Sequence, residues 1–223
     1  MDRLLKLPER LGVIASYIEP GARVADIGTD HGFLPVYLAQ RGLARGIIAS
    51  DISARSLASA KRTAAKYGVT DKIEFITAPG LDGIDRSQID TVLIAGVGGE
   101  TIADILQAAP WLNPQKHRLI LQPQSKTDKL CQQISKCGYA VLDAMLTQDR
   151  GRIYTAILAG SGDIPDGDPE MALYSLLVKK QDPLIGIFLD EMIDRARRAS
   201  TGTDGPKRFE ALRAFLQTYE TPK

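Results

Sequence analysis

Two aspartates and two glycines near the start of the chain have the types and spacing of a ligand-binding loop. A short apolar run reaches Asp26 and continues into Gly28, Asp30 and Gly32. Glycines at such a turn let the backbone approach a ligand that a Cβ atom would block. The spacing differs from the G-x-G-x-x-G pattern of dinucleotide sites, and two acids would repel a pyrophosphate. The loop instead favours a ligand with a cationic centre and a free ammonium, such as S-adenosylmethionine. The alternative is an ordinary turn, where Asp and Gly are common.

A third aspartate, Asp51, lies near the end of the next apolar run, residues 46–52. Asp51 lies 23 residues beyond Gly28, and an acid at the end of a second strand is placed to accept hydrogen bonds from two ribose hydroxyls. The alternative is that Asp51 caps the helix that follows, for which Ser53 is the other candidate. The spacing from Gly28 favours the ribose role.

A glycine cluster ends the fully apolar run 91–96. Gly96, Gly98 and Gly99 fall within four residues, and each glycine costs chain entropy on folding. The carboxyl ends of parallel strands form the ligand crevice of a doubly wound sheet. We therefore expect the backbone here to approach a ligand rather than merely to turn.

The elements that must position these residues alternate between strand and helix. Apolar periodicity predicts strands over 23–28, 46–52, 72–78, 91–96, 118–123, 139–148 and 152–159, and helices over 7–18, 33–41, 53–67, 100–109 and 125–137. This order predicts an α/β fold, a Rossmann-like doubly wound sheet of seven strands with one antiparallel strand.

A second, smaller part follows a stretch rich in Gly, Pro and Asp at 161–169. Helices are predicted over 170–199, interrupted at Pro183, and over 207–219. We therefore divide the chain into a first domain, 1–160, that contains the sheet, and a C-terminal helical extension, 161–223. The extension is too small to bury much apolar surface alone, so it must pack on the first domain or on itself.

Composition limits the classes of function. The chain has 223 residues, a formal net charge of +1 and two cysteines, Cys131 and Cys137, six positions apart. This spacing indicates two reduced thiols and does not match a metal cluster. Because the net charge is near neutral, any nucleic-acid binding must come from a local basic patch. No segment has the length of a membrane span or the pattern of a signal peptide. We expect a soluble, cytoplasmic protein without membrane or metal partners, and a monomer.

Five segments together resemble a known family in order and spacing. They are residues 7–18 (LPERLGVIASYI), 25–35 (ADIGTDHGFLP), 94–99 (IAGVGG), 121–124 (LQPQ) and 149–154 (DRGRIY). The combination is similar to the bacterial tRNA (adenine(22)-N1)-methyltransferases and covers nearly the whole chain. The resemblance implies a Rossmann-like methyltransferase domain with a coiled-coil-like C-terminal hairpin, S-adenosylmethionine as cofactor and tRNA as substrate.

The resemblance and the patterns above assign roles to individual residues. Catalytic roles fall on Asp30, Gly98, Gly99 and Gln122; cofactor binding on Asp26, Gly28, Asp30, Asp51, Ile52, Gly80, Leu81 and Gly96; and substrate binding on Arg10, His31, Pro123 and Tyr154. Alternatives remain for two of them, because His31 could instead cap the helix near Phe33, and Tyr154 could belong to the core.

The chain departs from the family pattern in three places: at Pro79, at Val97, where the family tends to have Met, and at Pro8-Glu9, which replace a Ser-Lys pair. The family usually has Gly-Asp-Gly-Leu where this chain has Ala78-Pro79-Gly80-Leu81. That Asp would be expected to contact the adenine amino group of the donor. Pro79 offers neither a side-chain acceptor nor a backbone N–H, so the adenine must be held by neighbouring backbone or be held more weakly. Two other functions stay open: a methyltransferase for a small molecule or a protein, and a non-catalytic module that binds S-adenosylmethionine or RNA.

Overall fold

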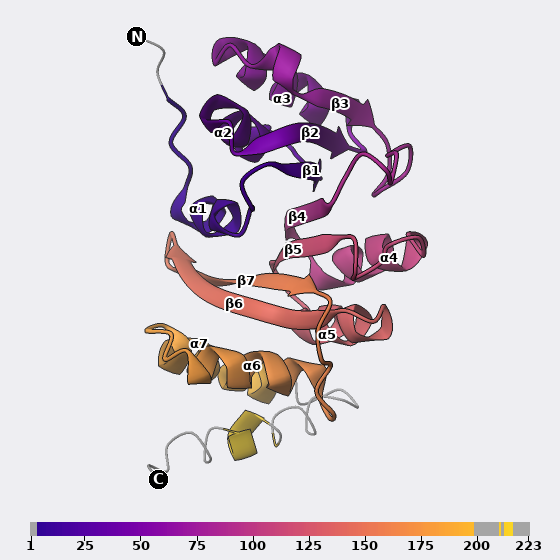
Figure 1. Ribbon diagram of the computed structural model, residues 1–223. Coiled ribbons are helices and arrows are strands. Elements are labelled where there is room, and N and C mark those ends of the chain that lie inside the picture. Colours follow the sequence, from indigo (N-terminus) through magenta and orange to yellow (C-terminus); the bar gives the residue numbers. More distant parts are fainter. Residues whose placement is uncertain (1–3, 199–209, 211, 216–223) are drawn as a thin grey trace.

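Seven strands form one sheet in a computed structural model of the chain, which describes residues 4–198, 210 and 212–215 (Figure 1). The strands are β1 (Ala22–Ile27), β2 (Ala44–Asp51), β3 (Glu74–Thr77), β4 (Thr91–Val97), β5 (Arg118–Pro123), β6 (Ala140–Asp149) and β7 (Arg152–Gly160). Their order across the sheet is β3-β2-β1-β4-β5-β7-β6. Among these seven strands, β7 alone runs opposite to the others, so its pairings with β5 and β6 are antiparallel. The predicted seven-stranded sheet with one antiparallel strand is confirmed.

The helices lie close to their predicted positions. They are α1 (Glu9–Ser16), α2 (Phe33–Arg41), α3 (Ala54–Lys66), α4 (Gly99–Ala108), α5 (Thr127–Lys136), α6 (Pro169–Lys179) and α7 (Ile185–Arg198), with a 3₁₀ turn, η1, at Thr70–Lys72. The largest difference is at α1, which is four residues shorter than the predicted helix 7–18. Pro8 is its N-cap, with ψ of 148°, so the helix begins only at the next residue.

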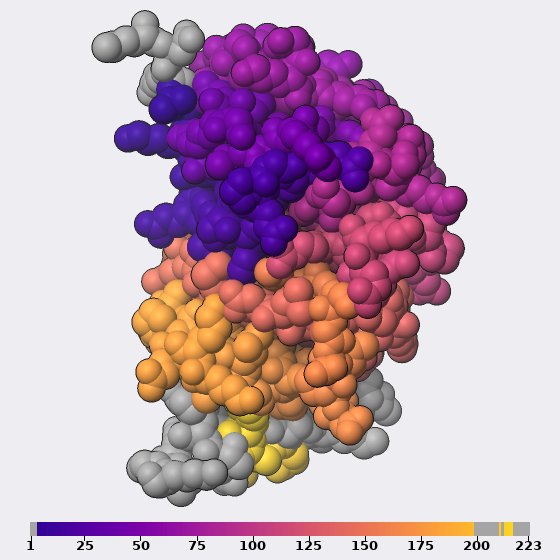
Figure 2. Space-filling model, in the orientation of Figure 1, coloured from indigo at the N-terminus to yellow at the C-terminus, as the bar shows by residue number. Residues whose placement is uncertain are grey.

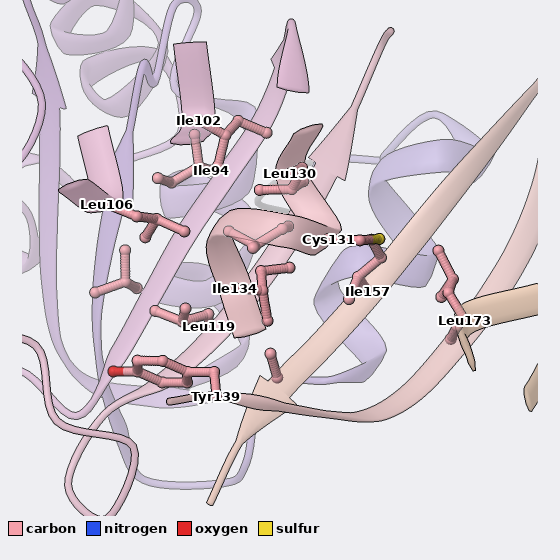
Figure 3. Packing of buried hydrophobic residues seen from close by; sticks show 14 of the residues in the cluster. Ile94, Ile102, Leu106, Leu119, Leu130, Cys131, Ile134, Tyr139, Ile157 and Leu173 are labelled. Carbon is pink, nitrogen blue, oxygen red and sulfur yellow. The ribbon is translucent and has the colours of Figure 1, made fainter. Parts of the chain in front are cut away.

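Each face of the sheet is covered by its own group of helices. Alternate residues of β4 and β5 point to opposite faces: Leu93 and Ile120 join the core under α1, α2 and α3, whereas Ile94 and Leu119 join the core under α4 and α5. Figure 3 shows the second core, where Ile102 and Leu106 of α4 and Leu130 and Ile134 of α5 meet the strands. Burial on both faces explains why β4 and β5 are continuous apolar runs.

The C-terminal helices α6 and α7 share the core on the α4–α5 face. Leu173, Tyr174, Phe188 and Leu189 are buried in the same cluster as Ile134. Figures 1 and 2 show α6 and α7 at one end of the molecule, beyond β6. The predicted interruption occurs between Lys179 and Ile185. The predicted helix 207–219 lies largely outside the described residues, and the domain boundary at residue 160 stays a prediction.

The topology places one crevice where a ligand is expected. The chain leaves β1 toward β2 on one side and reaches β4 on the other, so the strand order reverses between β1 and β4. The loops that follow these two strands diverge, and in open α/β sheets ligands bind outside the carboxyl ends of strands at this point. Among the described helices, none has the length and apolarity needed to cross a membrane.

Candidate functional site

A cavity of about 640 Å³ occupies the crevice at the carboxyl ends of β1, β2 and β4. Nine of the residues assigned from sequence line it: Arg10, Asp26, Gly28, Asp30, His31, Asp51, Ile52, Gly80 and Gly96. They come from five separate segments of the chain. Three of the nine are carboxylates, so the cavity suits a ligand that carries positive charge. In the part of the chain that the structure describes, no three His, Cys, Asp or Glu side chains are grouped to hold a metal ion.

The loop after β1 is tied to the end of β2 by its backbone. The N–H groups of Gly28 and Thr29 both donate to the Ser50 carbonyl, at 2.8 and 3.0 Å. Gly28 has φ of +74°, and Asp30 also lies in the left-handed region at +49°. This tight turn directs the two acids of the loop, Asp26 and Asp30, to one cavity.

Asp51 holds the same loop in place with its carboxylate. One oxygen accepts a hydrogen bond from the Asp30 N–H at 3.1 Å, and the other accepts from the Ser53 N–H at 2.8 Å. The N-cap of α3 is Ser53, whose hydroxyl accepts from the Ser56 N–H. The alternative that Asp51 caps this helix is therefore wrong. A carboxylate oxygen accepts more than one hydrogen bond, so Asp51 retains capacity for a ligand.

The Asp26 carboxyl is the most strongly perturbed acid of the cavity. Only 4% of the residue is exposed. The pKa of Asp26 is raised from 3.8 to about 7, chiefly by burial; the Thr29 hydroxyl offsets part of the rise and the nearby Asp51 charge adds to it. The cost of burying this charge is expected to fall when a cationic ligand group lies beside it.

Asp26→Asn is therefore expected to stabilise the ligand-free protein at high pH. In the unfolded chain Asp26 ionises near pH 3.8, but in the folded protein it resists ionisation until about pH 7. The parent loses stability across this window as pH rises, whereas the variant does not. The gain should be absent below pH 4 and reach up to about 4 kcal/mol above pH 7. Urea unfolding at pH 4, 6 and 8 measures it; an equal gain at all three pH values would contradict the assignment.

Arg10 enters the cavity from α1 and is held by three groups. Its Nε lies 3.5 Å from Asp149 Oδ2, its Nη1 donates to Gln122 Oε1 at 3.4 Å, and its guanidinium lies 5.8 Å from the centroid of the Tyr154 ring. Gln122 Nε2 in turn donates to the Arg10 carbonyl at 3.0 Å. Gln122 therefore contacts both the side chain and the backbone of Arg10. It is itself fully buried and does not line the cavity.

Gln122→Leu is expected to free Arg10 while preserving side-chain volume. The variant removes both amide contacts and leaves the Arg10 carbonyl without its donor. If Arg10 binds the substrate, loss of its fixed position should reduce kcat/KM for methyl transfer about tenfold or more. Affinity for S-adenosylmethionine, measured by calorimetry, should change little. Equal losses in donor and substrate affinity would instead indicate a general collapse of the cavity.

Five assigned residues besides Gln122 also lie outside the cavity lining. Leu81 lines a smaller neighbouring cavity of about 240 Å³, Pro123 is buried at the end of β5, and Tyr154 is partly buried beneath Arg10. Gly98 and Gly99 begin α4. A Cβ atom at Gly99 would lie 2.3 Å from the Lys126 carbonyl oxygen, so packing alone requires glycine there. The catalytic roles assigned to Gly98 and Gly99 stay predictions.

His31 stands at the rim of the cavity with its ring exposed. Its Nδ1 lies 2.9 Å from the Ser59 hydroxyl and its Nε2 lies 3.7 Å from Asp30 Oδ2. The ring stacks on Phe33, with centroids 5.6 Å apart. Gly32, not His31, is the N-cap of α2, so the capping alternative for His31 is wrong.

The cavity also contains residues that sequence patterns did not assign. They are Leu11, Ile27, Thr29, Phe33, Leu34, Ser56, Ala78, Pro79, Ile94, Ala95, Val97, Thr101, Ile105 and Gln124. For Gln124 a signal existed, because it ends the segment 121–124 and follows a predicted strand. Ser56, Thr101 and Ile105 lie on helices, and nothing in their spacing distinguishes them from ordinary helical positions.

Comparison with known proteins identifies the family. Residues 7–157 match the family model described as a methyltransferase domain. The tRNA (adenine(22)-N(1))-methyltransferase of Bacillus subtilis is 38% identical over 185 residues, which cover 83% of this chain and 75% of that protein. The chain belongs to this methyltransferase family. The resemblance seen in the sequence segments is confirmed.

Solved structures of the tRNA (adenine(22)-N(1))-methyltransferase family agree. The crystal structure of the B. subtilis m1A22 tRNA methyltransferase has a TM-score of 0.81 and 28% identity, covering 97% of this chain and 100% of that chain. A putative tRNA methyltransferase of Streptococcus pneumoniae, solved with S-adenosyl-L-methionine, has a TM-score of 0.83 and 25% identity, covering 95% of this chain and 100% of that one. The match extends through the C-terminal helical part, beyond the methyltransferase domain alone.

Proposed function

We propose that this protein transfers a methyl group from S-adenosylmethionine to N1 of adenine 22 in tRNA. The observation that carries the proposal is the acidic cavity at the β1–β4 crevice, in a chain of the tRNA (adenine(22)-N(1))-methyltransferase family. The B. subtilis relative is named for this reaction. Because its substrate is tRNA, we expect the enzyme to act in the cytoplasm. We expect no partners besides the methyl donor and the RNA.

The donor site is formed by residues whose chemistry fits S-adenosylmethionine. Asp51, at the end of β2, accepts from the ribose hydroxyls. Asp26 and Asp30 offset the positive charge of the donor. Gly28 and Gly96 leave space for its approach, and Ile52, whose side chain is largely exposed at the rim, covers the adenine. Gly80 and Leu81 complete the adenine end, where Pro79 stands in place of an acid.

Catalysis in this site depends on alignment more than on proton transfer. When bound, S-adenosylmethionine supplies an electrophilic methyl group on a sulfonium. Adenine N1 carries a free lone pair at neutral pH, so no strong general base is required. The chain must hold the nucleophile in line with the methyl group, and such positioning accounts for much of the acceleration.

The product adenine is cationic, and the cavity wall is suited to stabilise it. Asp30 is exposed at the rim of the cavity, which Gly96 and Val97 also line; the carbonyl groups of the 96–99 loop are the other candidates. Oriented carboxylate and carbonyl oxygens lower the energy of a transition state that gains positive charge. Gln122 acts through Arg10 and is a positioning residue in this proposal.

The RNA side of the site centres on Arg10, His31 and Tyr154. N1 of a paired or stacked adenine is not accessible, so the base must leave its stack at a cost of a few kcal/mol. Arg10 is fixed in position before substrate arrives, and aromatic rings at a site rim provide stacking surfaces for extruded bases. Pro123 supports this wall at the end of β5.

The test is transfer of labelled methyl from S-adenosylmethionine to unmodified tRNA, followed by nucleoside analysis. The expected product is 1-methyladenosine at position 22, absent from a tRNA in which that adenine is replaced by guanine. Donor binding without any labelled tRNA would contradict the proposal. In that case small molecules and proteins become the acceptors to examine.

A further inference from the structure

A second large cavity, of about 610 Å³, opens at the opposite end of the sheet. It is bounded by the start of β1, the loop before β4 and the loop before β5, through Arg23, Ile89 and His117. The seven residues of β4 separate it from the donor cavity, which is about 20 Å at 3.3 Å per residue. It is therefore a separate cavity, and nothing in the proposed reaction uses it.

Basic side chains line this second cavity. Arg23 is held by Asp90, with Nε 3.3 Å from Oδ2, and its Nη1 donates to the Ser87 carbonyl at 2.7 Å. Arg86 and Lys116 are exposed, and within the described residues neither has a carboxylate oxygen within 4 Å. The cavity thus presents two cationic groups whose charge is not offset by an ion pair.

The acids nearest this cavity are already engaged. The Asp90 carboxylate serves Arg23 and also lies 3.9 Å from Arg45. The Asp85 carboxylate accepts hydrogen bonds from the N–H and the hydroxyl of Ser87, at 2.9 and 2.8 Å. The hydrogen bonds from Ser87 leave Asp85 charged, but three cations, Arg23, Arg86 and Lys116, line the cavity against these two acids. The balance of charge therefore favours an anion.

An aromatic wall completes the second cavity. Trp111 is partly exposed, and its ring contacts the His117 ring edge to face, with centroids 5.4 Å apart. His117 is buried and its Nδ1 accepts from the Asn113 N–H at 3.1 Å. The imidazole thus fixes the loop that carries Trp111 and Lys116.

We propose that this cavity binds a nucleoside monophosphate group, with the phosphate on Arg86 and Lys116 and the base against Trp111. Proteins commonly bind a nucleotide without reading its sequence by two kinds of contact. Cationic side chains contact the phosphate oxygens, and a neighbouring aromatic ring stacks on the base. The volume falls within the range of small-molecule sites. The nucleotide is either free in solution or a residue of an RNA chain, since both present the same groups.

Tryptophan fluorescence provides a direct readout, because Trp111 is the only tryptophan in the chain. Adenosine 5′-monophosphate, adenosine and inorganic phosphate are titrated into the full-length protein. S-Adenosylmethionine is kept in excess, because Trp111 also lines the small cavity beside Pro79, next to the donor cavity. We expect saturable quenching by the monophosphate, with weaker binding of adenosine and of phosphate alone.

Single substitutions at the two cations test the assignment. Arg86→Ala and Lys116→Ala should each weaken the monophosphate about tenfold, because a hydrogen bond to a charged group is lost. The control is Lys136→Ala, an exposed cation on α5 outside the cavity, which should leave binding unchanged. No saturable change in fluorescence, or equal affinity in the Arg86→Ala/Lys116→Ala double variant, would overturn the proposal.

Competition separates the two sources of nucleotide. Displacement of the monophosphate by tRNA, with a marked loss of affinity at higher salt, would identify the natural ligand as an RNA residue. Quenching that tRNA leaves unchanged would identify a free nucleotide. Neither result depends on methyl transfer, so failure of the proposed reaction and failure of this site are told apart.

Discussion

Asp51→Ala is expected to weaken S-adenosylmethionine binding by about 100-fold or more and to abolish methyl transfer at ordinary donor concentrations. If Asp51 accepts from both ribose hydroxyls, the variant loses two hydrogen bonds to a charged acceptor, each worth about 1.5–3 kcal/mol. It also releases the Asp30 N–H, which Asp51 holds at 3.1 Å, so the β1–α2 loop loses a fixed point. Calorimetric titration with the donor measures the change directly.

Two further variants make this result specific to Asp51. Asp71→Ala removes an exposed acid of η1, away from the cavity, and should bind the donor like the parent. Asp51→Asn keeps one carbonyl oxygen as an acceptor, so its loss should be intermediate. Unchanged donor affinity in Asp51→Ala, with thermal stability also unchanged, would show that the ribose is bound elsewhere.

Gly99→Ala is expected to lower the free energy of unfolding by about 3 kcal/mol or more. The new methyl group would lie 2.3 Å from the Lys126 carbonyl oxygen and 2.7 Å from that of Ser125. These are backbone atoms, which cannot rotate away, so the segment 124–126 has to move. Inserting a group into closely packed backbone costs at least as much as overpacking a core. For a chain of this size the melting temperature should fall by roughly 6–12 °C.

Gly98→Ala is the matched control, one residue earlier. Gly98 has φ of −66° and ψ of 148°, which any residue adopts, and a Cβ there would meet the hydroxyls of Ser125 at 3.4 Å and Thr101 at 3.9 Å. Its melting temperature should stay within about 2 °C of the parent. If Gly98 lies against the substrate, as its assignment predicts, methyl transfer should fall in this variant without loss of stability. A stable, fully active Gly98→Ala protein would contradict that assignment.

Local sequence brought Asp26 and Asp51 to one cavity correctly, for a physical reason. Asp26 and Asp51 each close an apolar strand, and parallel neighbouring strands bring their carboxyl ends to one edge. Once β1 and β2 are recognised as neighbours, the two acids must lie in the same cavity. The glycine of the first loop, Gly28, follows from the same turn.

Sequence patterns were less informative where one residue type serves two purposes. The glycines after β4 indicated backbone close to a ligand, and this fits Gly96, which lines the cavity. For Gly99 the structure gives a packing reason, because the loop 124–126 passes directly over it. A glycine that makes room for a ligand and a glycine that makes room for a neighbouring loop cannot be distinguished in a single sequence.

The sequence by itself determined the fold class, the family and the loops that line the main cavity, because these depend on periodicity and on residues close together along the chain. Only the tertiary structure decided the environment of Arg10. Its partner Gln122 lies 112 positions away, and no local pattern encodes a contact that exists only after β5 and α1 have packed together. The same holds for the second cavity, whose cations Arg86 and Lys116 come from loops that meet only when β4 and β5 pair in the folded sheet.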